Sequence, residues 1–328
     1  MVEMAYTTLG DTGLEVSRLC LGCMNFGSEQ PWMVGDREAS LEVIERAIDL
    51  GINFFDTANV YSHGESEEIL GEAMDGRRDE FVVATKVRGQ MTDRPNGAGL
   101  SRKHIIEQAE ASLARLGTDY IDLYQIHRWD PETPIAETLS ALDYLVERGK
   151  VRYVGASTMA AWEFTTALYE SDLRDYERFV SMQPEYSLVR RHEEANLLPV
   201  CADQGVGVIP WSPLAGGFLA GKYERDAEPT EGRASESEYL DPLLADDDAW
   251  DVLDAVCAIA DERGATPVQV SLAWLLEKDV VTAPIVGPRT VEHLDDAVGA
   301  LDVSLSDDDL ARLEEPLDPV WSRAIARI

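Results

Sequence analysis

Side chains that can carry protons follow three successive apolar runs of the chain. Asp56, Lys86 and His127 each stand directly after one of these runs. A carboxylate, an amine and an imidazole are side chains from which enzymes build general acid–base catalysis. Each has an ordinary explanation alone: Asp56 as the cap of a turn, Lys86 as a solvated cation, His127 as a hydrogen-bonded core residue. Because all three take the same place in the pattern, we expect them to converge on one site.

The three runs belong to a set of eight, each followed by a segment with helical periodicity. The runs, which we predict to be β-strands, are 18–22, 52–55, 81–85, 121–126, 151–156, 179–182, 206–210 and 280–286. Apolar strands alternating with helices indicate a parallel sheet, and eight such units are the count of a (β/α)8 TIM barrel, an α/β fold. Such a barrel carries its active site at the carboxyl ends of the strands. The competing fold, a doubly wound dinucleotide-binding sheet, needs a Gly-x-Gly-x-x-Gly motif after its first strand, and none is there.

Capping residues give the limits of several predicted helices. Gly51, Gly117 and Gly149 stand where helices end, and Thr133-Pro134 and Thr266-Pro267 are typical of helix starts. Ser101, which can cap a helix, stands at the start of the helix that ends before Gly117. The predicted helices span 37–50, 101–116, 134–148 and 267–277.

We expect a single barrel domain over residues 1–328 with three additions. A β-hairpin at about 6–17 precedes the barrel, and a long loop at about 212–245 interrupts it. An extension at 302–328 follows and begins with an extra helix at 306–314. Long connections of this kind are usually functional or mobile.

Composition excludes several classes of partner. The chain has 62 acidic and 28 basic residues, a formal charge of −34 at pH 7. A surface this acidic repels phosphates, so no nucleic-acid partner is expected. Only five of the basic residues are lysines, and this bias predicts a halophilic protein. Neither a signal-peptide pattern nor an 18-residue apolar stretch occurs, so we expect a cytoplasmic protein with no membrane contact.

The four cysteines do not form a disulfide framework in a chain of this length. Cys20 and Cys23 form a Cys-x-x-Cys pair within an apolar run. A zinc site would need two more ligands nearby, and a thioredoxin-like pair would open a helix. We therefore expect structural thiols and no metal site.

Beyond these patterns, the segment GINFFDTANVYSHGESE at 51–67 resembles the signature of the aldo-keto reductase superfamily. The resemblance continues, in order, with ATK at 84–86, LYQIH at 123–127, GAST at 155–158, QPEYS at 183–187, WSPLAGGFLAGK at 211–222 and PIVG at 284–287. It covers the chain from Leu9 to about Leu301. The Trp-Ser-Pro-Leu form is similar to the branch that includes bacterial general-stress reductases and potassium-channel β subunits.

The resemblance implies reduction of an aldehyde or ketone to an alcohol, or the reverse, with hydride transfer from NAD(P)H. The family's catalytic tetrad falls on Asp56, Tyr61, Lys86 and His127. In that assignment Tyr61 is the general acid, and Lys86 lowers its pKa from the ordinary value near 10. Asp56 keeps Lys86 charged, and His127 orients the carbonyl oxygen.

The resemblance also implies binding of NADP(H), with NAD(H) possible. Ser157 and Gln183 are similar to the pair that holds the nicotinamide carboxamide, with Thr158 where many members have Asn. Trp211 would stack on the nicotinamide. The other implied contacts, to the pyrophosphate and adenosine, are Ser212, Leu214, Gly216, Lys222, Arg233, Gly287, Arg289, His293 and Asp296.

Two of these positions bear on cofactor preference and two depart from the family pattern. Arg233 and Arg289 are candidates to meet a 2′-phosphate, which would favour NADPH. Asp296 replaces the usual Glu near the adenine, and Ala297 replaces the usual Asn, so the adenine contact is weaker than in the family.

Two functions from different classes fit the resemblance. One is a reductase of small carbonyl compounds. The other is a regulatory subunit that binds NADPH and senses its redox state, with slow or no steady turnover. Both would keep the tetrad, whereas a barrel enzyme without nicotinamide would leave the ordered motifs unexplained. The physiological substrate, the direction of the reaction and the oligomeric state stay open.

Overall fold

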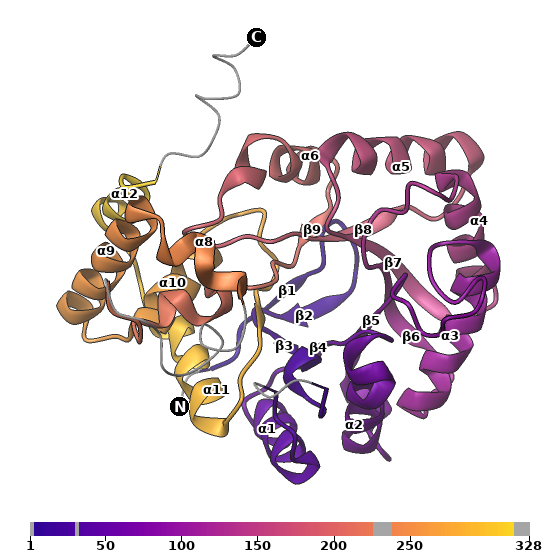
Figure 1. The fold of residues 1–328 in the computed structure, drawn as a ribbon, viewed down its shortest axis with the longest axis horizontal. Helices are drawn as coiled ribbons and strands as arrows, with labels where there is room; N and C mark the ends of the chain where they lie inside the picture. The colour runs from indigo at the N-terminus through magenta and orange to yellow at the C-terminus, as the bar shows by residue number, and fades with distance from the viewer. Residues whose placement is uncertain (1–2, 30–32, 226–237, 318–328) are drawn as a thin grey trace.

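Eight parallel strands form the ring of a barrel in a computed structural model that describes residues 3–29, 33–225 and 238–317 (Figure 1). The strands are β3 (Cys20–Gly22), β4 (Phe54–Asp56), β5 (Val82–Val87), β6 (Ile121–Ile126), β7 (Val151–Ser157), β8 (Phe179–Gln183), β9 (Gly207–Val208) and β10 (Ile285–Val286). Their order in the sheet is β10-β3-β4-β5-β6-β7-β8-β9. The backbone of Val208 closes the ring, because it donates to Val280 O at 3.2 Å and accepts from Thr282 N at 2.8 Å. The predicted barrel is confirmed.

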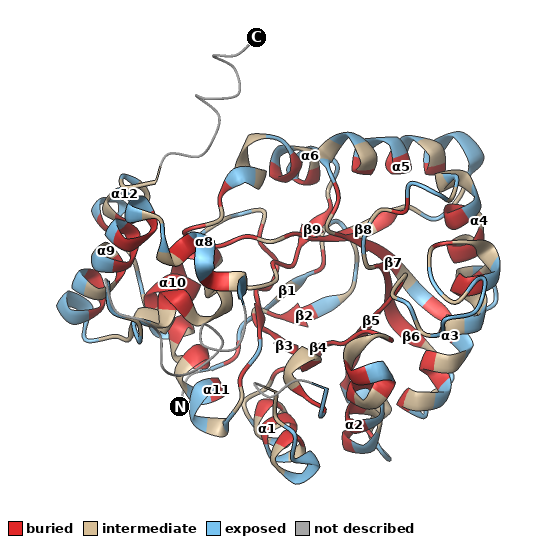
Figure 2. Cartoon of the chain, viewed as in Figure 1, coloured by how far each residue is buried: buried red, intermediate tan, exposed pale blue. Residues whose placement is uncertain are grey.

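Helices cover the outside of the strands. They are α1 (Arg37–Asp49), α2 (Glu65–Ala73), α3 (Arg102–Leu116), α4 (Ile135–Glu147), α5 (Ala161–Arg174), α6 (Leu197–Asp203), α8 (Asp241–Leu244), α9 (Asp247–Arg263), α10 (Pro267–Leu276), α11 (Val291–Val298) and α12 (Asp307–Glu314). Figure 2 shows that the strands are buried and that the helices turn buried faces inward and exposed faces outward. None of these described helices is long and apolar enough to span a membrane.

The predicted helix caps are mostly confirmed. Ser101 accepts from the His104 backbone, and Thr266 forms a capping box with Gln269. One start is wrong by a residue: Pro134, not Thr133, is the N-cap of α4. The reason is that the Thr133 hydroxyl donates to Asp130 Oδ2 at 2.8 Å instead of facing the helix.

Several strands extend into the polar residues that were expected to follow them. Asp56, Ser157 and Gln183 end their strands, and Lys86 lies inside β5. Polar residues do not end these strands because their side chains find hydrogen-bond partners within the barrel, which removes the cost of burying them. By contrast, the first and the last two strands are shorter than predicted.

The predicted hairpin at 6–17 is formed by β1 (Tyr6–Thr8) and β2 (Glu15–Ser17), which pair antiparallel. In Figure 1 the hairpin is visible in the middle of the ring of strands. Leu9 and Val16 are fully buried and join the cluster inside the barrel with Phe54 and Leu123. Gly10 has a φ of +56°, and a Cβ there would lie 2.5 Å from Gly205 O, so only glycine allows this close approach. The hairpin therefore plugs one end of the barrel.

The long connection and the C-terminal extension are described in part. Within 212–245 the chain forms short helical turns at Ala215–Ala220 and Glu238–Leu240 before α8. The extra helix predicted at 306–314 is confirmed as α12, with Ser306 as its cap. Residues 226–237, which include Arg233, and 318–328 lie outside the described residues.

Candidate active site

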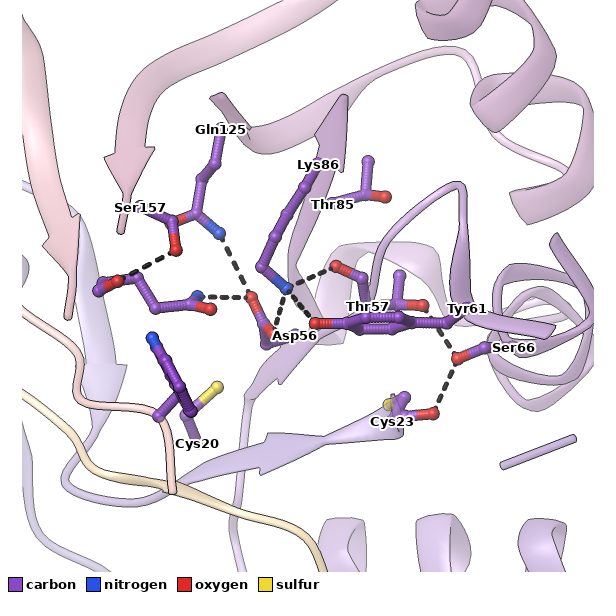
Figure 3. A network of polar contacts seen from close by, with 12 residues as sticks. Cys20, Cys23, Asp56, Thr57, Tyr61, Ser66, Thr85, Lys86, Gln125 and Ser157 are labelled. Carbon is purple, nitrogen blue, oxygen red and sulfur yellow. Dashed lines mark hydrogen bonds and ion pairs between the residues drawn. The ribbon is translucent and has the colours of Figure 1, made fainter. Parts of the chain in front are cut away.

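Lys86 is the centre of a buried polar cluster drawn in Figure 3. Its amine donates to Asp56 Oδ1 at 2.5 Å, to Thr57 O at 2.9 Å and to the Tyr61 hydroxyl at 3.1 Å. Lys86 is 0% exposed and Asp56 is 3% exposed. Tyr61 reaches the cluster from a short helical turn, Tyr61–Gly64, that follows β4. The structure therefore brings together three of the residues proposed as the tetrad.

The ionisation of this cluster differs from expectation at Tyr61. Burial raises the pKa of the phenol above its usual value, and the nearby Lys86 charge opposes this effect without reversing it. The charge of Lys86 acts in the expected direction, but burial of the phenol is the larger effect. Burial acts to lower the pKa of Lys86, but Asp56 and Tyr61 outweigh it, so the pKa of this amine lies above the usual value. Lys86 is a cation and Tyr61 a neutral phenol at neutral pH.

His127 completes the group from the neighbouring strand end. Its ring meets the Tyr61 ring edge-on, with centroids 5.7 Å apart. Burial lowers the pKa of His127 to about 3, and the positive charges of Lys86, Arg128 and Arg88 contribute further. The imidazole is therefore neutral at physiological pH, with one N–H available to donate.

The second oxygen of Asp56 is held by two amide groups. Gln125 Nε2 donates to Asp56 Oδ2 at 3.1 Å, and Gln183 Nε2 donates to the same oxygen at 2.8 Å. Both glutamines are buried. Among the described residues no donor is found for the side-chain oxygen of Gln183, so this oxygen can accept a hydrogen bond from a ligand amide.

A cavity of about 610 Å³ opens over this cluster. Lys86 is buried behind Asp56 and Tyr61, and Arg233 is not among the described residues. Every other residue predicted for the site lines the cavity: Asp56, Tyr61, His127, Ser157, Thr158, Gln183, Trp211, Ser212, Leu214, Gly216, Lys222, Gly287, Arg289, His293 and Asp296.

Two residues on the cavity wall have unusual backbone angles. Thr158 has a φ of +45° and Ser212 a φ of +51°, in the left-handed region that β-branched and other side chains rarely adopt. Trp211 lies beside them, and its indole nitrogen donates to Thr158 Oγ1 at 3.2 Å. Ser157 donates to Gln183 O at 2.9 Å. Strained backbone of this kind clusters at ligand sites.

Positive groups gather at the far end of the cavity. Partial burial lowers the pKa of His293, followed by the charges of Arg289 and Lys222, so the three side chains are close. Within the described part of the chain, neither Arg289 nor Lys222 forms an ion pair with a carboxylate. Arg289 also precedes the N-terminus of α11, where backbone N–H groups attract anions. This end of the cavity suits a phosphate.

Glycine backbone lines the same region. Gly216 has a φ of +68°, and a Cβ there would lie 2.9 Å from the ring of Tyr239. Gly217 follows with a φ of +93°. Side chains are thus excluded here, and a ligand can approach the backbone closely.

Asp296 has a structural bond that the sequence did not predict. Its Oδ1 accepts from Thr266 Oγ1 at 2.8 Å and from Gln269 Nε2 at 3.0 Å. Asp296 therefore ties α11 to the capped start of α10, in addition to lining the cavity. One oxygen that was expected to serve the adenine is already occupied.

Sequence reasoning did not identify Gln125, Gly217 and Tyr239 as site residues. A signal existed for Gln125, because side chains alternate along a strand. Leu123, two residues earlier in β6, belongs to the cluster inside the barrel, so Gln125 must point inward as well. Gly217 and Tyr239 lie in the long connection, where no periodicity places them.

The cysteines are free thiols. Cys20 lies in β3 and Cys23 follows it, and both are buried near Asp56 (Figure 3). Burial raises the pKa of each thiol, so neither is a reactive thiolate. Across the described ranges, no group of three or more His, Cys, Asp or Glu side chains is placed to hold a metal ion.

Comparison with known proteins agrees with this geometry. The model of the aldo/keto reductase family matches residues 18–318. Versiconal hemiacetal acetate reductase of Aspergillus parasiticus is 40% identical over 96% of this chain and 98% of its own length. An uncharacterized oxidoreductase of Bacillus subtilis is 40% identical, with 95% of both chains covered, and a putative aryl-alcohol dehydrogenase of Schizosaccharomyces pombe is 37% identical, with 96% of both covered. The chain belongs to the aldo/keto reductase family and is an oxidoreductase.

Proposed function

We propose that this protein reduces aldehydes or ketones with NAD(P)H and that Tyr61 is the general acid. The observation that carries the proposal is the placement of the Lys86 amine between Asp56 and the Tyr61 hydroxyl, beneath a cavity that His127 also lines. Relatives named as a reductase and an aryl-alcohol dehydrogenase support chemistry at a carbonyl or alcohol carbon.

Each residue of the cluster has a distinct task in this proposal. A nicotinamide cofactor, when bound, would supply the hydride that reduces the carbonyl carbon. The neutral His127 donates an N–H hydrogen bond to the carbonyl oxygen and orients it. As negative charge develops there, Tyr61 transfers its phenolic proton to that oxygen. Lys86, 3.1 Å from the phenolic oxygen, stabilises the phenolate left behind, and Asp56 holds the amine in place.

The raised pKa of Tyr61 sets the protonation state from which reduction and oxidation start. A phenol that keeps its proton at neutral pH is ready to donate it to a developing alkoxide. The reverse reaction needs the phenolate to accept the alcohol's proton, and burial disfavours that form. Oxidation of the alcohol therefore depends on the small phenolate fraction and should gain from a rise in pH, whereas reduction should not.

The residues at the cavity fit a nicotinamide dinucleotide. Gln183 lines the cavity with Ser157, and its side-chain oxygen could accept a hydrogen bond from a carboxamide, while Trp211 offers an aromatic face. Lys222 and Arg289, which form no ion pair with a carboxylate in the described ranges, suit phosphates at the other end. Arg289 supports a preference for NADPH, since a guanidinium binds a 2′-phosphate well.

The test is steady-state turnover of 4-nitrobenzaldehyde, followed by loss of NADPH absorbance. Tyr61→Phe should lose about 10²- to 10⁴-fold in kcat, the usual contribution of a general acid, with little change in NADPH binding. Tyr169→Phe, at a tyrosine that is 63% exposed on α5, is the matched control and should be unchanged. Retention of more than about a tenth of kcat by Tyr61→Phe would remove Tyr61 from this role. A single slow oxidation of tightly held NADPH, without further turnover, would instead indicate the regulatory subunit.

A further inference from the structure

Two arginines, Arg88 and Arg128, lie close enough to His127 for their charges to lower its pKa. Arg88 follows β5 and Arg128 follows His127 at the end of β6. Nε of Arg88 is buried and makes no hydrogen bond, while Arg128 lines the cavity and is exposed. In the ranges that the structure describes, neither guanidinium forms an ion pair with a carboxylate.

The lack of an ion pair is shared in the described ranges by other arginines such as Arg94 and Arg148, but Arg88 differs from them because its buried Nε has no hydrogen-bond partner. Other arginines of this protein find carboxylates, for example Arg37 with Glu72 and Arg46 with Asp295, both at 2.7 Å. A buried donor without a partner costs free energy, and a fold keeps one where something else supplies the partner. Arg128 lines the cavity, and both arginines are close enough to His127 to lower its pKa, so a ligand at this side of the cavity would meet them.

Asp130, a carboxylate whose pKa the Arg88 charge helps to lower, already has other hydrogen-bond partners. Asp130 accepts hydrogen bonds from Leu100 N at 2.8 Å, Glu132 N at 3.1 Å and Thr133 Oγ1 at 2.8 Å. These bonds lower the pKa of Asp130 against the effect of its burial, and the Arg88 charge adds a smaller contribution. Asp130 thus accepts hydrogen bonds from the residues around it and forms no ion pair with Arg88.

The backbone holds Arg88 in an unfavourable conformation. Its φ is +136°, in the region where side chains are rarely found, and its carbonyl accepts from Gly99 N at 2.9 Å. Glycine adopts a positive φ without strain, so a glycine at position 88 would be the unstrained choice. The chain instead has its glycine at the next position, Gly89. Backbone strain of this kind persists at functional sites.

The order of strands separates these arginines from the phosphate end of the cavity. In the ring of eight, β6 lies four strands from β10 in either direction, so Arg128 and Arg289 project from opposite sides of the barrel mouth. Arg88 is next to Arg128, since β5 pairs with β6 and His127 N donates to Val87 O at 2.9 Å. The pair is therefore on the side where His127 meets the carbonyl group.

We propose that Arg88 and Arg128 form an anion subsite that binds a carboxylate on the carbonyl substrate. The inference rests on the proposed reductase function and names its substrate class: aldehydes or ketones that carry a carboxylate. A guanidinium presents a planar set of donors that matches the two oxygens of a carboxylate. Two of them beside a neutral His127 would draw such a substrate into an otherwise acidic protein and orient its carbonyl group.

The test compares 4-carboxybenzaldehyde with methyl 4-formylbenzoate, which share the ring and the reactive aldehyde but differ in charge. Both are measured with NADPH at one fixed KCl concentration, because salt screens this attraction. The wild type should favour the carboxylate in kcat/KM by about 10- to 100-fold, the range of a hydrogen bond to a charged group. Arg128→Gln should lose most of this preference, mainly through KM for the carboxylate. Arg94→Gln, at an exposed arginine in the same loop as Arg88, should keep it.

The outcomes separate the two proposals. Equal kcat/KM for both aldehydes in the wild type, or an unchanged preference in Arg128→Gln, would overturn the anion subsite while the reductase function stands. No turnover of either aldehyde would overturn the reductase function. Calorimetric titration with benzoate then reads the subsite without turnover, since Arg128→Gln should bind it about tenfold more weakly. Equal benzoate affinity of the wild type and Arg128→Gln would overturn the subsite.

Discussion

Replacing Lys86 by methionine removes the cation that Asp56 and Tyr61 share and leaves a carboxylate inside the barrel. Lys86 is 0% exposed and its amine is 2.5 Å from Asp56 Oδ1, so solvent does not compensate for the loss. Breaking a buried ion pair by removing one partner costs about 3–5 kcal/mol. The entropy of unfolding scales with chain length, and for 328 residues each kcal/mol corresponds to roughly 1.5 °C in Tm. We expect Lys86→Met to lower Tm by about 4–8 °C.

The double variant Asp56→Asn/Lys86→Met separates stability from chemistry. The asparagine removes the unpaired charge, and its carbonyl oxygen can still accept from Gln125 and Gln183. The double variant should therefore be more stable than Lys86→Met, although both should be inactive. Thermal unfolding followed by circular dichroism at pH 7 and one KCl concentration gives the stabilities, and NADPH oxidation gives the activities. A loss below about 1 kcal/mol in Lys86→Met, or a double variant less stable than Lys86→Met, would refute the view that Lys86 balances a buried charge.

Three further predictions concern pH, cofactor and salt. The pKa of Tyr61 is raised and that of His127 is about 3, so neither group titrates between pH 6 and 8. We therefore expect kcat for reduction to be flat over this range, whereas kcat for oxidation of the alcohol should rise with pH. A reduction rate that falls across this range would contradict both assignments. Arg289→Ala should raise KM for NADPH more than KM for NADH, and equal effects would exclude a contact with the 2′-phosphate. The protein has a net charge of −34, and salt screens the repulsion between its carboxylates. We therefore expect Tm at pH 7 to rise by many degrees from 0.1 to 3 M KCl. A flat curve, with full activity at low salt, would contradict adaptation to salt.

The barrel could be predicted because its strands and helices follow local rules. Eight apolar runs, glycines at helix ends and capping residues such as Ser101 and Thr266 each report on their own neighbourhood. Strand limits were less predictable, since the strands include the polar residues Lys86 and Gln183, which were expected to follow them. Their burial depends on partners from other strands, which one segment of sequence does not reveal.

The positions of the catalytic candidates could be predicted, but their ionisation could not. Phe54 and Leu123 face the inside of the barrel, so Asp56 and His127 follow by simple alternation and must point inward too. The raised pKa of Tyr61 depends on how much protein covers the phenol, which no spacing indicates. The second task of Asp296, as a partner of Thr266, likewise depends on how two helices pack.

The pairing of the first barrel strand with the last has a consequence for synthesis of the chain on the ribosome. Cys20 in β3 pairs with Ile285 in β10, so the first strand of the barrel waits for nearly the whole chain before its free edge is covered. Open sheet edges attract other strands, and nascent chains are exposed to such association. The carboxylates that repel one another on the folded protein would also keep two growing chains apart during this interval, because like charges repel at a distance. The acidic side chains can thus protect the chain from association before it has folded.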